Sequence, residues 1–402
     1  QLNKRISNYK FNSNILNSLL GRKKFYKING IAIDSRNVKK NNLFLAIRGK
    51  NNDGNQFIKK AIQKGASFAI TSNSKKNLNK KIIKVKNVNN FLNGFAKIKR
   101  EKSNAKILAI TGSAGKTSLK NMIYDLLKNF KKTYASPKSY NNHYGVPLSI
   151  SNLELDHQIG IFEVGMSQAG EIYKLSKIIK PNLAIITNIA EAHIENFKNI
   201  KGIAKAKGEI IDNIKKNGSV ILNRDDNFFN LLSKKAKLKK LKVISFGKSK
   251  KSDVQLLSVK KQNDFNYIIV KAKSKKFQFK IRNVNIYNIL AAITLLLELG
   301  IKVENKFSLF QALQPSAGRG QIHKIKRYKK TFNLIDESYN ANPLSVHNAI
   351  KNFMKIDKSN SKKYLLLGDM LELGEKSEKY HSNLSRLINS SDIDKVFVKG
   401  EK

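Results

Sequence analysis

Short apolar runs alternate with longer amphipathic stretches over most of this 402-residue chain. From 106 to about 314, β-rich runs at 159–162, 183–186, 219–222 and 242–246 are separated by stretches with apolar residues at helical spacing. Strands that alternate with helices in this way are typical of a parallel sheet in an α/β fold. The pattern therefore predicts an α/β protein with a parallel sheet at its centre.

The pattern changes on both sides of this central part. The first hundred residues predict a helix at 57–64 and short strands at 30–33, 43–47 and 67–70. The polar, basic segment 99–105 then marks a domain boundary. An antiparallel appendage is predicted at 254–281, a strong helix at 287–299, and a further α/β block after Pro315 with strands at 332–335 and 364–367.

These shifts predict three domains, at 1–103, 104–314 and 315–402. The chain stops directly after the strand-like run 395–398. We therefore expect the third domain to be incomplete.

A glycine-rich loop with phosphate-binding character lies between the predicted strand 106–110 and a helix that begins near Thr117. Its sequence is Thr111-Gly-Ser-Ala-Gly-Lys-Thr-Ser118. The glycines let backbone N–H groups approach a phosphate, Lys116 reaches the outer phosphates, and Thr117 offers a hydroxyl to Mg²⁺. The loop departs from the general pattern because Ile110 stands where a first glycine is usual. An ordinary turn is the alternative, since a Gly-Lys-Thr triplet also arises by chance.

Composition excludes some classes of protein and leaves one open. The formal net charge is +50, which favours nucleic acid as a partner in many chains. Here lysine is spread over the whole length beside many Asn, Ile and Phe, which a genome rich in A and T also produces, so we expect no specific nucleic acid. The chain has no cysteine, which excludes disulfides and thiolate metal sites. It shows neither a secretory segment nor a membrane-spanning run, so we expect a cytoplasmic protein without membrane insertion.

Two polar side chains follow central strands, at the edge where open α/β sheets bind ligands. Glu163 comes directly after the run 159–162, and His193 lies just past the run 183–186. A carboxylate and an imidazole placed there are suited to Mg²⁺ of a bound nucleotide. The alternatives are a solvated carboxylate and an ordinary histidine. The segment 223–226 also follows a strand and is interpreted as a helix cap.

Several separated motifs occur in an order that resembles the Mur ligases of peptidoglycan synthesis. They lie at 111–117, 139–148, 162–166, 188–193, 202–209 and 285–292. Two more, 336–343 and 367–374, look like those of the members that add D-alanyl-D-alanine. The segment 336–343 argues against relatives that add the third amino acid and against folylpolyglutamate synthases. A nucleic-acid-stimulated P-loop ATPase is the rival from another class.

The resemblance implies a three-domain architecture with a central P-loop, parallel-sheet ATPase domain and a C-terminal Rossmann-like domain. It implies an ATP- and Mg²⁺-dependent enzyme, expected to be a monomer, whose partners are UDP-N-acetylmuramoyl-tripeptide and D-alanyl-D-alanine. For the nucleotide and the reaction it implies roles for Gly112, Ser113, Ala114, Gly115, Lys116, Thr117, Ser118, His193, Lys207, Asn288, Arg319 and Asp336. Among these, Asn288 would meet the adenine, while Arg319 and Asp336 would close on the γ-phosphate and the ribose. The implied metal ligands are Thr117, Glu163, His193 and Lys207, the last as a carbamate.

The substrate contacts implied by the resemblance are less specific. Ser35 and Arg36 belong to a segment that looks like the uridine-recognition segment of the family, although Asn55 stands where a histidine is more usual. Tyr339 and Asn340 would contact the dipeptide, and Asn141 and Asn142 the muramoyl peptide. Asparagines of this kind are also ordinary turn formers, which is the alternative for both pairs.

Overall fold

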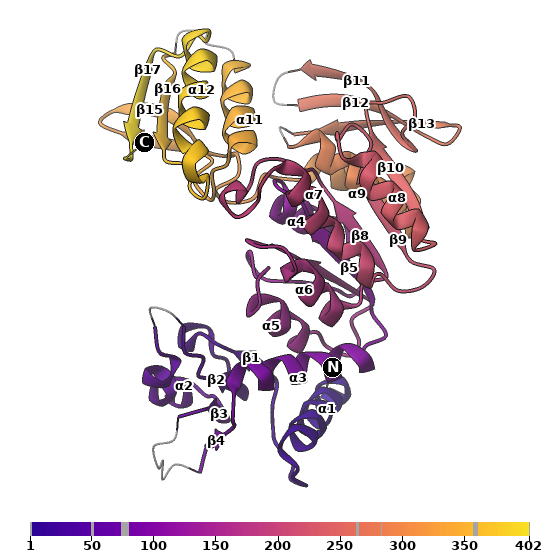
Figure 1. Ribbon diagram of the computed structural model, residues 1–402, viewed down its shortest axis with the longest axis vertical. Coiled ribbons are helices and arrows are strands. Elements are labelled where there is room, and N and C mark those ends of the chain that lie inside the picture. Colours follow the sequence, from indigo (N-terminus) through magenta and orange to yellow (C-terminus); the bar gives the residue numbers. More distant parts are fainter. Residues whose placement is uncertain are drawn as a thin grey trace. The chain divides into compact units, whose positions relative to one another are not determined.

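The computed structural model describes residues 2–49, 52–73, 80–262, 265–282, 284–356 and 361–401. Its helices and strands are labelled in Figure 1. The chain divides into two compact units. The first comprises 1–109, 127–164 and 174–182, and the second comprises 110–126, 165–173 and 183–402.

The first unit contains a four-stranded parallel sheet of order β1-β2-β3-β4. The strands of this unit are β1 (Gly30–Ala32), β2 (Asn42–Leu45), β3 (Phe68–Thr71) and β4 (Ile82–Lys84), which form that sheet, and β6 (Thr133–Ala135) and β7 (Ile159–Glu163), which belong to a larger sheet. Its helices are α1 (Leu2–Leu20), α2 (Ile58–Gln63), α3 (Val88–Lys102) and α5 (Gly145–Ser151). The strands predicted at 30–33, 43–47 and 67–70 and the helix at 57–64 are confirmed, with ends shifted by one to a few residues.

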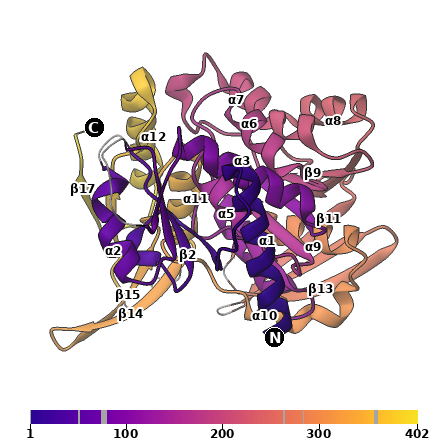
Figure 2. The same ribbon diagram turned by 90° about the horizontal axis from the view of Figure 1, so that it is seen from below.

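Side chains along β2 and the residue after it point alternately to the two faces of this small sheet, and both faces are buried. Leu43 and Leu45 belong to one apolar core together with residues of α1 and α3. Phe44 and Ala46 belong to a second core, which includes Ala61 of α2. Because neighbouring side chains of a strand point to opposite faces, a short apolar run fills two cores at once. Helices α1 and α3 lie side by side in both views (Figures 1 and 2).

The basic segment 99–105, which is predicted to mark a domain boundary, begins with the buried end of a helix. Helix α3 continues to Lys102, and the side chains of Lys99 and Arg100 are each only 2% exposed. The Lys99 ammonium donates to Asn12 Oδ1 at 2.7 Å. The Arg100 guanidinium donates to the carbonyls of Ile179 at 2.6 Å and Lys180 at 2.8 Å. These buried cations are therefore satisfied by polar atoms far away in the sequence.

Among the described residues, the largest sheet has nine strands. Those not yet given are β5 (Lys106–Thr111), β8 (Leu183–Ile186), β9 (Ser219–Asn223), β10 (Lys242–Gly247), β11 (Val254–Gln262), β12 (Phe265–Ala272) and β13 (Lys275–Ile281). The order of all nine strands is β13-β12-β11-β10-β9-β8-β5-β7-β6. Strands β8, β9, β10 and β11 pair in parallel, whereas β11, β12 and β13 pair antiparallel. Both the predicted parallel sheet and the antiparallel appendage at 254–281 are thus confirmed.

Helices of the second unit accompany these strands. They are α4 (Lys116–Leu127), α7 (Ile200–Lys207), α8 (Phe229–Leu238), α9 (Ile286–Glu298), α10 (Phe307–Ala312), α11 (Pro343–Met354) and α12 (Ser377–Asn389), while α6 (Glu171–Ile179) contains residues of both units. Helix α9 is apolar nearly all round and its residues from Asn288 to Leu296 are buried. A helix of this kind belongs in a core, which confirms the strong helix predicted at 287–299.

The last part of the second unit carries four more strands. Strands β14 (Gln321–Arg327) and β15 (Lys330–Asp336) form an antiparallel hairpin, drawn in orange in Figure 2. Strands β16 (Tyr364–Gly368) and β17 (Lys395–Lys399) pair in parallel. The strands predicted at 332–335 and 364–367 are confirmed, and β14 is an additional strand. No helix in the described part of the chain is long and apolar enough to cross a membrane.

Candidate active site

The glycine-rich loop joins the end of β5 to the first residue of α4, as the sequence predicts. Gly112 has φ +147° and Gly115 has φ +81°, values that residues with a side chain rarely adopt. A Cβ atom on Gly112 would lie 1.9 Å from Thr187 Oγ1. Glycine is therefore required at position 112 both by its backbone conformation and by the close approach of Thr187.

A segment that follows β8 holds this loop in place. The Thr187 hydroxyl donates to the Ala114 carbonyl at 2.6 Å. Asn188 pairs with the same residue twice, since its Oδ1 accepts from the Ala114 N–H at 2.9 Å and its Nδ2 donates to the Ala114 carbonyl at 3.2 Å. The Ser113 hydroxyl donates to the Ala190 carbonyl and accepts from the Ala190 N–H, both at 2.8 Å. The segment 187–190 is thus a hydrogen-bonded support for the loop.

Two further side chains bind carbonyl groups of the loop. The Lys116 ammonium bends back and donates to Gly112 O at 2.8 Å, which places a positive charge over the loop. Asn288, buried in the first turn of α9, donates from Nδ2 to Gly115 O at 3.2 Å. Asn288 is expected to meet the adenine. In this structure its amide binds the loop itself.

Arg319 reaches the same loop from the segment that follows α10. Its Nη2 donates to Thr117 Oγ1 at 3.1 Å, and its guanidinium lies 4.4 Å from the ring centre of Tyr339. A second contact joins the Asn121 amide to the Ser316 hydroxyl at 3.1 Å. The structure therefore brings Arg319, Thr117 and Tyr339 together, although they are far apart in the sequence.

Asp336 and Asn340 lie on either side of Tyr339. Asp336 Oδ1 accepts from the N–H of Ser338 at 3.0 Å and from its hydroxyl at 2.6 Å, and these hydrogen bonds lower the pKa of the Asp336 carboxyl. Tyr339 is half exposed and Asn340 is exposed. Asn342, the next asparagine along the chain, has a structural role, because it forms a capping box at the start of α11.

Lys207, the last residue of α7, is a buried lysine in a chain where most lysines are solvated. Its side chain is 2% exposed, and the described part of the chain gives its amine no hydrogen bond or ion pair. Burial, with a smaller contribution from the charge of Lys116, lowers the pKa of Lys207 well below its ordinary value. Burial therefore favours the neutral, nucleophilic form of the amine.

His193 lies in the loop after β8 and adopts a left-handed backbone conformation with φ +59°. Its Nδ1 contacts a carboxylate oxygen of Glu372, which lies in the predicted motif 367–374. Burial lowers the pKa of His193, Lys207 and Lys116 lower it further, and Glu372 opposes them. A neutral imidazole whose Nδ1 faces a carboxylate has Nε2 available as a ligand atom. The sequence singled out the motif but gave no sign of this pairing.

In the first unit, Glu163 is buried at 1% exposure and accepts from the Asn141 amide at 2.7 Å. The side chain of the neighbouring Asn142 binds backbone groups of its own loop. Its Oδ1 accepts from the N–H groups of Tyr144 at 3.2 Å and Gly145 at 2.9 Å, at the start of α5. Asn141 thus lies beside a predicted metal ligand, whereas Asn142 performs the loop role that was its alternative.

The predicted uridine-recognition segment forms a short turn. Ser35 is buried, and Arg36 is 81% exposed at its side chain while its guanidinium pairs with both oxygens of Asp34. The hydrogen bond from Arg36 is the largest factor that lowers the pKa of Asp34. Asn55, which replaces the usual histidine, donates to Asp53 at 2.7 Å and accepts from the Thr71 hydroxyl. The amide therefore bridges two segments of this unit.

Sequence reasoning missed the role of two adjacent carboxylates after β9. The interpretation of 223–226 as a helix cap is confirmed only in part. Asp226 Oδ1 accepts from the N–H of Phe228, the residue before α8, at 2.9 Å, whereas Phe228 itself has no side-chain cap bond. Asp225 and Asp226 also bind backbone and hydroxyl groups of three other segments. Their place after a strand at the ligand-binding edge of the sheet was the available signal.

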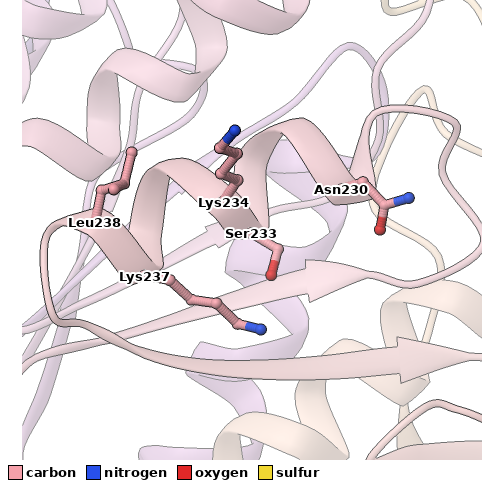
Figure 3. Close-up of a pocket in the computed structure, with 5 residues that line it drawn as sticks. All are labelled: Asn230, Ser233, Lys234, Lys237 and Leu238. Carbon is pink, nitrogen blue, oxygen red and sulfur yellow. The ribbon is translucent and has the colours of Figure 1, made fainter.

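A shallow hollow lies along α8, lined by Asn230, Ser233, Lys234, Lys237 and Leu238 (Figure 3). It shares no residue with the glycine-rich loop or with the other predicted site residues. We assign no role to it.

Three family models match successive parts of the chain. The Mur ligase family catalytic domain matches residues 27–100, the Mur ligase middle domain matches 110–296, and the Mur ligase glutamate ligase domain matches 318–402. A UDP-N-acetylmuramoyl-tripeptide–D-alanyl-D-alanine ligase of Buchnera aphidicola subsp. Baizongia pistaciae is 34% identical over 93% of this chain and 80% of its own length.

Two solved structures are similar over nearly the whole chain. MurF from Acinetobacter baumannii has a TM-score of 0.83 and 26% identity, covering 97% of this chain and 85% of its own. MurF ligase from Thermotoga maritima in complex with ADP has a TM-score of 0.79 and 28% identity, covering 94% and 85%. The family models, the sequence identity and the shared fold agree with the glycine-rich loop described above. The chain therefore belongs to the Mur ligase family.

Proposed function

We propose that this chain is an ATP-dependent ligase that joins D-alanyl-D-alanine to UDP-N-acetylmuramoyl-tripeptide. The observation that carries the proposal is the loop 112–118, with Lys116 bent over it and Arg319 bound to Thr117. The name of the Buchnera relative and the ADP complex of the Thermotoga structure support the substrate and the nucleotide. The division into 1–103, 104–314 and 315–402 is part of this proposal, with the UDP-substrate, ATP and dipeptide sites in that order.

The reaction needs an activated carboxylate, because a carboxylate is a poor electrophile. Phosphoryl transfer from ATP to the terminal carboxylate of the tripeptide gives an acyl phosphate and ADP. The amine of D-alanyl-D-alanine then attacks the acyl carbon, and the intermediate collapses to an amide and phosphate. Lys116 and Arg319 supply fixed positive charge for the phosphoryl group in transfer. Much of the remaining contribution is the positioning of the two reactants.

Mg²⁺ is the second part of the proposal. Of the ligands that the resemblance implies, the Thr117 hydroxyl and the buried Glu163 carboxylate are oxygen donors of the kind that a hard cation prefers, and His193 offers an imidazole nitrogen. The buried amine of Lys207, whose pKa is lowered, fits carbamylation by CO₂, which would convert it into an anionic oxygen ligand with release of a proton. When bound, Mg²⁺ would offset the negative charge of the phosphates.

The dipeptide contacts are proposed for Tyr339 and Asn340, and the uridine contacts for Ser35 and Arg36. Tyr339 stands against Arg319, so a dipeptide bound there would lie beside the predicted site of phosphoryl transfer. Asn141 lies next to Glu163 and is our candidate for contact with the muramoyl peptide.

The test is substrate-dependent ATP consumption by the purified chain. We expect ADP and phosphate to form only when UDP-N-acetylmuramoyl-tripeptide and D-alanyl-D-alanine are both present. A panel of amines, with diaminopimelate, lysine and glutamate beside the dipeptide, separates this activity from those of other Mur ligases. Preference for a single amino acid over the dipeptide would overturn the proposal.

A further inference from the structure

Asp226 binds the segment 187–190, which holds the glycine-rich loop by hydrogen bonds. Its Oδ2 accepts from the Ile189 N–H at 2.7 Å, and its Oδ1 accepts from the Phe228 N–H at 2.9 Å. Ile189 lies between Asn188 and Ala190, the two residues that bind the loop. The carboxylate thus holds the middle of the segment on which the loop rests.

Asp225 fixes a second neighbour of the loop. Its carboxylate accepts from the N–H groups of Lys248 at 2.6 Å and Ser249 at 3.0 Å, and from the Tyr287 hydroxyl at 3.0 Å. Tyr287 precedes Asn288, whose amide binds Gly115. The close approach of Asp225 also depends on Gly247, where a Cβ atom would lie 2.8 Å from its Oδ2.

We infer that Asp225 and Asp226 are positioning residues for the nucleotide, which act through the two segments that hold the phosphate-binding loop. Asp226 orders the segment 187–190 beneath Ser113 and Ala114, and Asp225 orders the start of α9 beside Gly115. The inference rests on the proposed nucleotide site, and neither carboxylate is assigned a contact with the nucleotide. A loop that must present several backbone groups at once loses affinity when its supports shift by a fraction of an ångström.

Asp226→Asn is the main test, because the amide keeps the size and removes one acceptor. One of the two backbone N–H groups then faces an NH₂ group, so we expect the Kd for ADP and the KM for ATP to rise about tenfold. The KM for UDP-N-acetylmuramoyl-tripeptide should stay within about twofold of wild type. Hydrogen exchange of the Ile189 amide should become faster.

Tyr287→Phe is a milder second variant, since it removes one hydroxyl and leaves the ring in place. We expect it to weaken ADP binding about threefold with unchanged thermal stability. The matched control is Asp212→Asn, which removes a carboxylate that pairs with Lys235 and Lys239 on the same unit. This control should leave ADP binding unchanged.

The pattern of kinetic constants separates positioning from mere loss of structure. A partly unfolded enzyme has fewer active molecules, which lowers apparent kcat and leaves the KM for ATP unchanged. If Asp226→Asn and Tyr287→Phe bind ADP as tightly as wild type, the inference is overturned. If wild type itself binds no ADP, the proposed function fails instead, and the two failures are therefore distinguishable.

Discussion

Lys116 and Lys207 differ physically from most of the lysines that dominate this chain. Lys116 donates to a carbonyl of the loop, and Lys207 is buried with a strongly lowered pKa. The loop sequence is sufficient to predict Lys116. Composition could not separate Lys207 from dozens of solvated lysines, because burial is a property of the folded chain, and only the family resemblance pointed to it.

Lys116→Ala should abolish acyl-phosphate formation and leave the binding of UDP-N-acetylmuramoyl-tripeptide nearly intact. A charge that stabilises phosphoryl transfer contributes mainly to the transition state, so turnover should fall at least about a hundredfold. Steady-state kinetics measures this effect. Lys131→Ala, at an exposed lysine, is the control. Near-normal turnover of the Lys116 variant would disprove the assignment of the loop.

Lys207→Ala should be inactive and should recover part of its activity in acetate or formate. A small carboxylate can occupy the position that the carbamate would have filled. Intact-mass measurement of wild type in bicarbonate, at a pH high enough to keep carbamates, should show an added CO₂ that the variant lacks. Full activity of the variant without added carboxylate would contradict a role for Lys207.

At the scale of elements, most strands of the second unit could be predicted because buried parallel strands read as apolar runs. Helix α3 was missed although Phe91, Leu92 and Phe95 recur at helical spacing. Its charged end dominated the interpretation, and the partners of Lys99 and Arg100 lie far away in the sequence. The support of the glycine-rich loop was missed for the same reason, since the hydrogen bonds of Thr187 and Asn188 join segments that no local pattern connects.

The buried end of α3 predicts an unusual pH dependence of stability. Burial lowers the pKa of Lys99 from 10.5 to about 8, so the unfolded chain binds this proton more tightly than the folded chain. Stability should therefore rise as pH increases from about 8 toward 10.5. Relative to Lys99→Met, wild type should gain about 2 kcal/mol in free energy of unfolding between pH 7.5 and 10. Urea denaturation of both proteins measures this gain, and parallel pH profiles would refute the prediction.

At the scale of the whole molecule, the net charge of +50 makes a prediction about nucleic acid. We expect DNA binding that is weak, independent of sequence and lost steeply between about 50 and 200 mM salt, as counterion release requires. Ligase turnover should be unaffected by DNA at about 150 mM salt. A filter-binding titration beside the ligase assay measures both. Tight binding to one sequence, or ATP turnover that needs nucleic acid, would favour the rival ATPase.

The phosphate-binding loop is made early in the chain, but the side chains that hold it are made late. Thr187 comes 73 residues after Ala114, Asn288 comes 173 after Gly115, and Arg319 comes 202 after Thr117. A ribosome adds about 5–20 residues each second, so roughly 10 to 40 s separate the synthesis of the loop from that of its last partner. A nascent chain that ends before residue 288 carries the complete loop sequence but lacks Asn288, one of the side chains that hold the loop. We therefore expect nucleotide binding to be acquired only after residue 319 has been synthesised, and until then ATP cannot stabilise the nascent chain against quality control.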